Sequence, residues 1–546
     1  MNFMHNETAE KLRGGYYTPA DLAAFLAKWV AKSKPKDILE PSCGDGAFLS
    51  ALAAAGLGAS KTTAVELDGI EAAKAAARAR DLGINSKILN QDFLSWAIEK
   101  MSTGKTRFDA VVGNPPFVRY QYLPATFQIE AEQIFATLEC KFTKHTNAWV
   151  PFVLAAIALL RPGGRLAMVV PSEIIHVLHA QSLRTFLASQ CRKIVVVDPE
   201  EIWFEGTLQG AVLLMAEKKF SPSEEGAGLG LVPVRGRQFL KLDPERLFNT
   251  AVTINGRTIE TKWTRAFLSH SVRKLLDEVE SDSNFKRFTD VASVDVGIVT
   301  GANKFFLVSD AVIEQYGLQK WAHPMFGRSE HCPGILYDDA QHLRNREAGL
   351  PSNFLWFPDA NAMKDKKAKA YIKSGEAQEL HTRYKTRIRK NWFTVPSVSA
   401  SAIGMLKRCH NAPRLILNGV GAYTTDTAYR IQVDTMEPEA FVANFLNPLT
   451  ALSAELEGRT YGGGVLELVP SEIERVLVPA VKQPATSIQA VDKSIRTKSM
   501  AFVQETHGLK VLKAAGINKQ NGAILLEAWI QLKERRQRIG SSGDDD

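Results

Sequence analysis

The residues Asn114-Pro115-Pro116-Phe117 carry the clearest chemical signal in this chain of 546 amino acids. They follow the apolar run 108–113, which is typical of a buried strand that ends in a rigid turn. Two prolines fix two φ angles and remove two backbone donors, so the turn would hold the Asn114 amide and the Pro115 carbonyl in place. Two such acceptors suit an exocyclic amino group, and the ring of Phe117 suits a flat base. The same residues could also form a plain turn, but the sequence before them favours the chemical interpretation.

A second set of candidate binding residues lies at the ends of three earlier predicted strands. The loop 40–46 joins a strand to a helix, where glycines let the backbone approach a ligand and the helix supplies free N–H groups. It has neither the GxGxxG spacing of dinucleotide enzymes nor the lysine of a P-loop. Glu66 follows at the position where a carboxylate holds a ribose diol in doubly wound folds. Asp92 and Phe93 could bind an adenine amino group and ring face, although Phe93 could instead belong to the core.

Alternating strands and helices must position these residues. We predict strands at 37–40, 62–67, 86–90, 108–112, 165–170, 193–198 and 211–216, and helices at 21–32, 47–55, 69–81, 147–160 and 173–190. This alternation favours a parallel sheet covered by helices on both faces. The pattern stops near residue 219, and 221–230 reads as a linker. We therefore expect a catalytic domain over 1–220 and a second domain over 230–546 that ends in a helix at 515–539.

The series of motifs resembles the S-adenosylmethionine-dependent methyltransferases with a seven-stranded sheet. Residues 13–19 match the family's cofactor-capping motif, and their place before the glycine loop and before 114–117 is the order of the gamma-class N6-adenine DNA methyltransferases. The resemblance implies a doubly wound seven-stranded α/β sheet followed by a C-terminal mixed α+β target-recognition domain. It is strong over 13–216 and looser beyond about 230, where 296–304 and 461–468 look like segments of the recognition region.

The resemblance also implies a cofactor and a set of site residues. The cofactor is S-adenosyl-L-methionine, and its expected contacts are Tyr17, Thr18, Pro19, Glu40, Ser42, Gly44, Gly46, Glu66, Asp92, Phe93 and Asn114. The catalytic residues are Asn114, Pro115, Pro116 and Phe117. The target adenine would be flipped out of the duplex and would stack between Phe117 and a second ring, for which we favour Phe204 over Trp203. Phe204 could instead be a core residue.

The basic charge of the chain is local and indicates double-stranded DNA as the partner. The net charge is +8, and residues 361–414 hold thirteen Lys or Arg against three acidic residues, a local charge of +10. The candidate DNA-binding residues are Arg119 and Tyr120 in the long segment after Phe117, and Lys364, Lys366, Arg383, Lys385, Arg387, Arg389 and Lys390, with aromatic residues between them (Tyr371, Tyr384, Trp392 and Phe393). Such cations would contact phosphates. A solvated helix face is the alternative.

Composition and motif content narrow the classes of protein to which this chain could belong. The five cysteines are scattered with no CxxC pair, so we expect neither a zinc site nor a disulfide framework. The longest apolar run, 148–160, is too short to span a bilayer and no signal peptide is visible, so we expect a cytoplasmic monomer. No nuclease motif is found, which favours a stand-alone modification enzyme with a separate restriction endonuclease. The alternatives are an RNA or protein-glutamine methyltransferase, and a non-catalytic DNA-recognition subunit.

Overall fold

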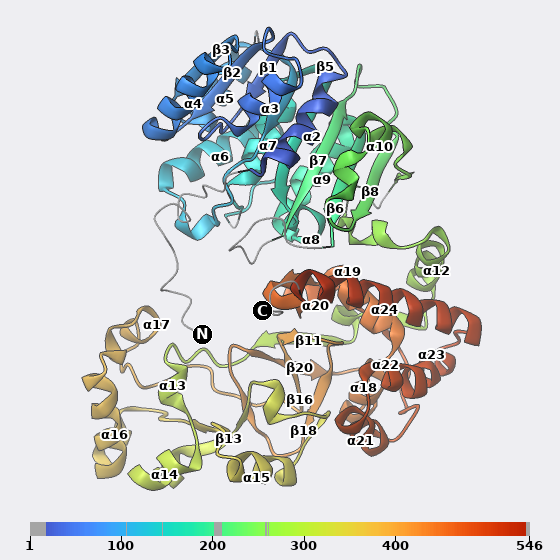
Figure 1. Ribbon diagram of the computed structural model, residues 1–546. Coiled ribbons are helices and arrows are strands. Elements are labelled where there is room, and N and C mark those ends of the chain that lie inside the picture. The colour runs from blue at the N-terminus through green and yellow to red at the C-terminus, as the bar shows by residue number, and fades with distance from the viewer. Residues whose placement is uncertain are drawn as a thin grey trace. The chain divides into compact units, whose positions relative to one another are not determined.

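The computed structural model describes residues 18–541 apart from 105, 145, 201–209, 257, 258 and 260. The chain divides into two compact units: the first comprises Met1–Leu268 and Arg538–Asp546, and the second spans Ser269–Gln537 (Figure 1). The catalytic domain over 1–220 and the second domain over 230–546 stay predictions, and the first compact unit continues to Leu268.

The first unit is built on one nine-stranded sheet. Its strand order is β3-β2-β1-β4-β5-β7-β6-β8-β9. The strands are β1 (Asp37–Glu40), β2 (Lys61–Glu66), β3 (Ser86–Asn90), β4 (Phe108–Gly113), β5 (Leu160–Pro171), β6 (Cys191–Pro199), β7 (Ala211–Lys218), β8 (Gly228–Val234) and β9 (Thr253–Ile254). The pairs from β3 to β5 are parallel, and β7 is antiparallel to both of its neighbours. The prediction of seven strands was wrong, because β8 and β9 extend the sheet beyond β6.

The segment 221–230, predicted to be a linker, contains the start of β8. Gly228 pairs in parallel with Lys193 of β6. Gly228 has φ +97°, and a Cβ atom there would collide with the Ile254 carbonyl of the neighbouring strand. The glycines that suggested a flexible linker therefore permit close packing of β8 against β9.

Helices cover both faces of this sheet, as predicted. One face packs against α5 (Phe93–Thr103), α6 (Ala125–Thr137), α7 (Trp149–Leu159) and α9 (Gln181–Gln190), and the other packs against α2 (Ala20–Ala31), α3 (Ala47–Ala54) and α10 (Pro244–Thr250). Strand β4 shows why: Val111 joins the first core, whereas Ala110 and Val112 join the second, because successive side chains of a strand point to opposite faces.

Two predicted segments of the first unit differ in the structure. The segment after Phe117, predicted to be a long loop, forms a 3-10 turn (Tyr120–Tyr122) and helix α6, whose Ala131, Ile134 and Phe135 are buried at helical spacing. The single helix predicted over 173–190 is divided into α8 (Glu173–His176), a 3-10 turn (Leu178–Ala180) and α9. Helix α4 (Gly69–Asp81) agrees with its prediction.

The second unit is a mixed α+β domain, in agreement with the expectation for the C-terminal half. Its sheets have the strand orders β11-β20-β16-β18-β14, β12-β15-β13-β19, β17-β22-β21 and β10-β23. Its short strands are β10 (Phe285–Arg287), β12 (Leu307–Val308), β14 (Leu336–Tyr337), β15 (Asn353–Leu355), β17 (Arg408–Cys409), β19 (Tyr423–Thr424), β21 (Arg459–Tyr461), β22 (Val465–Glu467) and β23 (Leu477–Pro479). Its longer strands are β11 (Ala292–Val296), β13 (Ala322–Phe326), β16 (Ile403–Leu406), β18 (Leu415–Asn418) and β20 (Ala428–Val433). Its helices include α12 (His270–Ser281), α15 (Asp339–Glu347), α16 (Lys366–Ala377), α17 (Tyr384–Arg387), α18 (Pro438–Phe445), α19 (Pro448–Glu457) and α21 (Ile488–Thr497). It also holds α24 (Lys519–Ser541) as far as Gln537. The predicted terminal helix is thus present as α24.

Candidate functional site

The glycine loop after β1 has the backbone conformation expected of a ligand-binding turn. Gly44 has φ +51° and Gly46 has φ +89°, both in the left-handed region that favours glycine. Gly46 is the N-cap of α3, and a Cβ atom there would lie 3.3 Å from the Cα atom of Ala75. The Gly46 amide donates to the Cys43 carbonyl at 2.8 Å. The loop is therefore tight, and it leads directly into the N-terminus of α3.

Glu66 joins this loop to the next one. Its Oε2 atom accepts a hydrogen bond from the Gly44 amide at 2.8 Å, and its Oε1 atom accepts one from the Asp68 amide at 2.9 Å. Each carboxylate oxygen can accept a further hydrogen bond. Glu66 is therefore held in one orientation at the carboxyl end of β2 with acceptor capacity left for a ligand.

Glu40 is a buried acid at the carboxyl end of β1. It is 1% exposed, and its Oε2 atom has no hydrogen-bond partner within the part of the chain that the structure describes. Burial raises the pKa of the Glu40 carboxyl well above its usual range, and the nearby Glu66 and Asp45 carboxylates raise it further. A buried acceptor without a partner is costly, so Glu40 is a position where a cationic donor would be stabilised.

The Asn-Pro-Pro-Phe turn meets the glycine loop directly. The Ser42 hydroxyl donates to the Asn114 carbonyl at 2.9 Å, and a Cβ atom at Gly113 would lie 3.3 Å from Cδ of Pro41. Strands β1 and β4 are parallel neighbours, with Leu39 opposite Val111, so their carboxyl ends emerge side by side. The structure thus brings together the predicted cofactor residue Ser42 and the predicted catalytic residue Asn114.

Packing holds the residues that follow Asn114. Pro115 is buried and Pro116 is half-buried, and the half-buried ring of Phe117 packs against both cores of the first unit. Sequence reasoning missed Asn147: its Oδ1 atom accepts from the Tyr120 amide at 3.2 Å, and its Nδ2 atom donates to Glu173 at 2.9 Å. Arg119 is exposed. The turn therefore leads into a segment with a defined position.

The residues after β3 have mainly structural contacts. Asp92 is the N-cap of α5, where its Oδ1 atom accepts from the Ser95 amide at 2.9 Å. The Phe93 ring is 2% exposed and packs against Phe152 at 4.9 Å between ring centroids. The structure therefore favours the core interpretation of Phe93 over stacking on a ligand.

A residue that sequence reasoning overlooked lies beside Glu66. Leu67 is 68% exposed, although it directly follows the end of β2. The Asn90 amide donates to the carbonyls of Glu66 and Leu67 at 3.0 and 2.9 Å, so this backbone is fixed. The signal was an apolar residue immediately after the acid, and it marks an apolar surface next to a carboxylate.

The structure describes only some of the residues predicted to cap the cofactor or to stack on the base. Thr18 is buried, and the Pro19 carbonyl accepts from the Leu22 and Ala23 amides at the start of α2. Tyr17, Trp203 and Phe204 lie outside the described residues.

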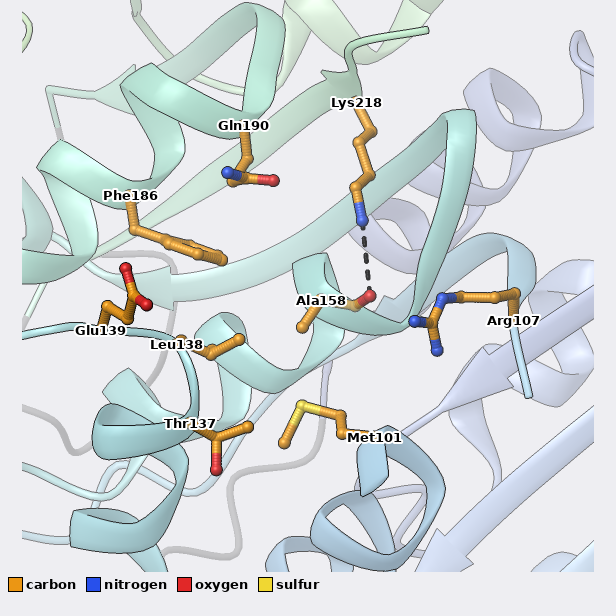
Figure 2. Close-up of a pocket in the computed structure, with 9 residues that line it drawn as sticks. All are labelled: Met101, Arg107, Thr137, Leu138, Glu139, Ala158, Phe186, Gln190 and Lys218. Carbon is orange, nitrogen blue, oxygen red and sulfur yellow. Dashed lines mark hydrogen bonds between the residues drawn. The ribbon is translucent and has the colours of Figure 1, made fainter. Parts of the chain in front are cut away.

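A pocket of about 340 Å³ lies at the end of the nine-stranded sheet opposite to Asn114 (Figure 2). Its lining includes Arg107, just before β4, whereas Asn114 follows the end of that strand. Lys218 also lines it, and its Nζ atom donates to the carbonyls of Ile157 and Leu160, both at 2.9 Å. Burial lowers the pKa of Lys218 to about 8. Lys218 thus caps the end of α7, and the pocket is separate from the site of Asn114.

The predicted DNA-binding cations are mostly exposed, whereas the aromatic residues between them are mostly buried. The exposed cations are Lys364, Lys366, Arg383, Lys385, Arg387 and Lys390. Arg389 is half-buried and donates to the Val299 carbonyl at 2.8 Å. Tyr371, Trp392 and Phe393 belong to a hydrophobic core, which leaves Tyr384 as the exposed ring of the four.

The described residues lack two further kinds of feature. Across them, no helix is long and apolar enough to cross a membrane. The same residues contain no group of three or more His, Cys, Asp or Glu side chains placed to hold a metal ion.

The family models and the relatives that match this chain are all named as DNA methylases or type II methyltransferases. Residues 2–227 match the family model described as N-6 DNA Methylase, and residues 260–512 match that of the C-terminal domain of type II methyltransferase M.Eco57I. Type II methyltransferase M.AccI of Acinetobacter calcoaceticus is 23% identical over 483 residues, with 84% of each chain covered. M.XamI of Xanthomonas campestris pv. amaranthicola is 22% identical, and the match covers 86% of this chain and 85% of M.XamI. M.TthHB8I of Thermus thermophilus is 29% identical, and the match covers 46% of this chain and 54% of M.TthHB8I.

The chain therefore belongs to the N-6 adenine DNA methylase family, and its similarity to type II methyltransferases extends over most of its length. It is an adenine-specific DNA methyltransferase. The resemblance inferred from the order of its motifs is confirmed, and the family uses S-adenosyl-L-methionine as methyl donor.

Proposed function

We propose that this enzyme methylates N6 of an adenine flipped out of duplex DNA, and that Asn114 and Pro115 position the reacting amine. The observation that carries the proposal is the hydrogen bond from Ser42 to Asn114, since it joins the candidate cofactor loop to the candidate catalytic turn. The Asn114 amide oxygen and the Pro115 carbonyl would accept the two N6 hydrogens and favour a tetrahedral nitrogen with its lone pair free. Catalysis would then depend on positioning and electrostatics.

The residues at the ends of β1 and β2 fit S-adenosyl-L-methionine. The buried Glu40 carboxylate oxygen, which has no hydrogen-bond partner among the described residues, suits the ammonium group of the methionine part. Glu66, oriented by two backbone amides, suits the ribose hydroxyls, and the exposed side chain of Leu67 suits the adenine ring of the cofactor. Gly44 and Gly46 would let the backbone approach. When bound, the cofactor supplies a methyl group on a positively charged sulfur.

The flipped base would stack on Phe117, whose ring is held by both cores of the first unit. Flipping exposes the amine to the Asn114 turn, which an adenine within the duplex could not reach. Phe204 remains our choice for the opposite face.

Double-stranded DNA would be held by the cations of the second unit, with Arg119 and Tyr120 on the segment after the catalytic turn. Exposed cations such as Arg383 and Lys385 can neutralise phosphates without reading the sequence. We also propose that the enzyme is the modification partner of a separate restriction endonuclease, with a protective role for the methyl group.

The decisive experiment identifies the methylated atom. Duplex DNA treated with the enzyme and cofactor is digested to nucleosides and analysed by mass spectrometry, and we expect N6-methyladenine. Asn114→Ala should lower turnover by about 100-fold or more and leave DNA and cofactor binding largely intact, because the backbone of the turn and the other cofactor contacts remain. Asn114→Asp keeps an acceptor and should retain measurable activity. Product on cytosine N4, on RNA or on protein would overturn the substrate proposal, and normal turnover of Asn114→Ala would overturn the role of Asn114.

A further inference from the structure

The second unit exposes two large apolar side chains within four residues of each other. Tyr384 is 64% exposed and Ile388 is 65% exposed. Tyr384 begins the short helix α17 and Ile388 directly follows it, so the two side chains are spaced as neighbours on one helical face. We call Tyr384 and Ile388 the apolar tip. Single exposed apolar residues are common in proteins, so the surroundings of the apolar tip decide its meaning.

Cations flank the apolar tip. Arg383, Lys385, Arg387 and Lys390 are exposed, and residues 383–390 contain no acidic residue. The Nζ atom of Lys385 and the Cζ atom of Arg387 each lie 5.6 Å from the centre of the Tyr384 ring. Among the described residues, these four cations form no ion pair, so their charges are available to an anionic partner.

The backbone that carries the apolar tip is held firmly. The buried Thr386 hydroxyl donates to the Leu380 carbonyl at 2.5 Å, and Arg389 donates to the Val299 carbonyl at 2.8 Å. A Cβ atom at Gly301 would lie 2.7 Å from the Cβ atom of Lys385, so the two segments approach as closely as glycine allows. The exposure of Tyr384 and Ile388 is therefore a built feature and not the consequence of a loose loop.

We infer that the apolar tip enters a groove of duplex DNA and contacts bases or sugars while the flanking cations contact phosphates on either side. Phosphates line both edges of a groove, whereas apolar side chains gain free energy only against the bases and sugars between them. Apolar wedges surrounded by cations are a known means of deforming a duplex, and a ring can also stack on a base. The inference rests on the proposed function, since it names how the second unit contacts the same DNA.

The test separates base contacts from charge contacts. The double variant Tyr384→Ser, Ile388→Ser should bind a fluorescein-labelled DNA duplex about tenfold more weakly in fluorescence anisotropy. It should bind fluorescein-labelled heparin, a polyanion without bases, with unchanged affinity. The charge variant Arg387→Gln, Lys390→Gln should lose affinity for both. Leu343→Ser, at a 50% exposed apolar residue of α15, is the matched control and should change neither.

Each other result overturns the inference. Unchanged duplex affinity of the double variant would show that the apolar tip does not touch DNA. An equal loss for duplex and heparin would assign the effect to charge, and a change of mass in sedimentation would identify a protein interface instead. Methylation of the same duplex by the wild-type enzyme is measured in parallel. Failure of the inference leaves that activity intact, whereas failure of the proposed function appears as missing N6-methyladenine with or without tip-dependent binding.

Discussion

Replacing Glu66 by Gln tests the cofactor site where its geometry is best defined. Glu66 accepts hydrogen bonds from Gly44 and Asp68 at 2.8 and 2.9 Å. A glutamine can satisfy only one of these amides with its oxygen, and its NH₂ group would then face the other amide or the ligand. Loss of one hydrogen bond to a charged acceptor costs about 1.5–3 kcal/mol, so we expect the Kd for the cofactor to rise by about 10- to 150-fold.

The assay is calorimetric titration with S-adenosylhomocysteine, the unreactive product, because it separates binding from turnover. Glu99→Gln is the matched control, since Glu99 is a 64% exposed glutamate of the same unit that pairs with Lys100. Thermal unfolding checks that the variant folds. An unchanged Kd for Glu66→Gln in a folded protein would refute the assignment of Glu66 to the ribose, and an equal change for Glu99→Gln would show a nonspecific charge effect.

Three further perturbations test the acids and cations described above. The raised pKa of Glu40 means that this acid keeps its proton to a higher pH than an ordinary glutamate. Below that pKa, binding of an ammonium group should release a proton, and the affinity for S-adenosylhomocysteine should rise as pH rises toward it. Calorimetry in buffers of different ionisation enthalpy measures this release, and its persistence in Glu40→Gln would exclude Glu40 as the source. Replacing Arg387 and Lys390 by Gln should reduce the slope of log affinity for duplex DNA against log salt by about 0.9 for each phosphate that is no longer neutralised, and an unchanged slope would make these cations a solvated face. Arg536→Met leaves the buried Glu455 unpaired from a 2.8 Å ion pair and should lower the free energy of unfolding in urea by about 3–5 kcal/mol, whereas adding Glu455→Met should restore much of it; wild-type stability of the single variant would contradict this.

The strands that carry the candidate site were predicted closely, because local sequence signals define them. The predicted strands 37–40 and 86–90 match β1 and β3. Glu40 and Glu66 are the last residues of β1 and β2, and Asn114 directly follows β4. Parallel strands put their carboxyl ends on one edge, so the approach of Ser42 and Asn114 was implied by topology alone.

Features that depend on contacts distant in the chain could not be predicted. Tyr371 and Trp392 lie among cations in the sequence, yet their ring centroids lie 4.5 and 4.9 Å from that of Phe305 in the core. Charge runs indicate exposure of the charged residues, but they do not indicate on which side the intervening rings pack. In the same way, whether Phe93 is buried or faces a ligand depends on where α5 starts. Asp92 is the N-cap of α5, and the side chain of Phe93 after it packs into the core.

The candidate cofactor loop and the candidate catalytic turn lie very close together in this fold. Ser42 and Asn114 are 72 residues apart in sequence, but one hydrogen bond of 2.9 Å joins them. Since β1 pairs in parallel with both β2 and β4, the loops after these strands meet without any long connection. Glu66 ties the loops after β1 and β2 together, and Ser42 ties the loops after β1 and β4 together. The loop after β1 is therefore the shared element through which a bound donor and a flipped base would be held in a fixed relation, and small shifts in this loop would affect both.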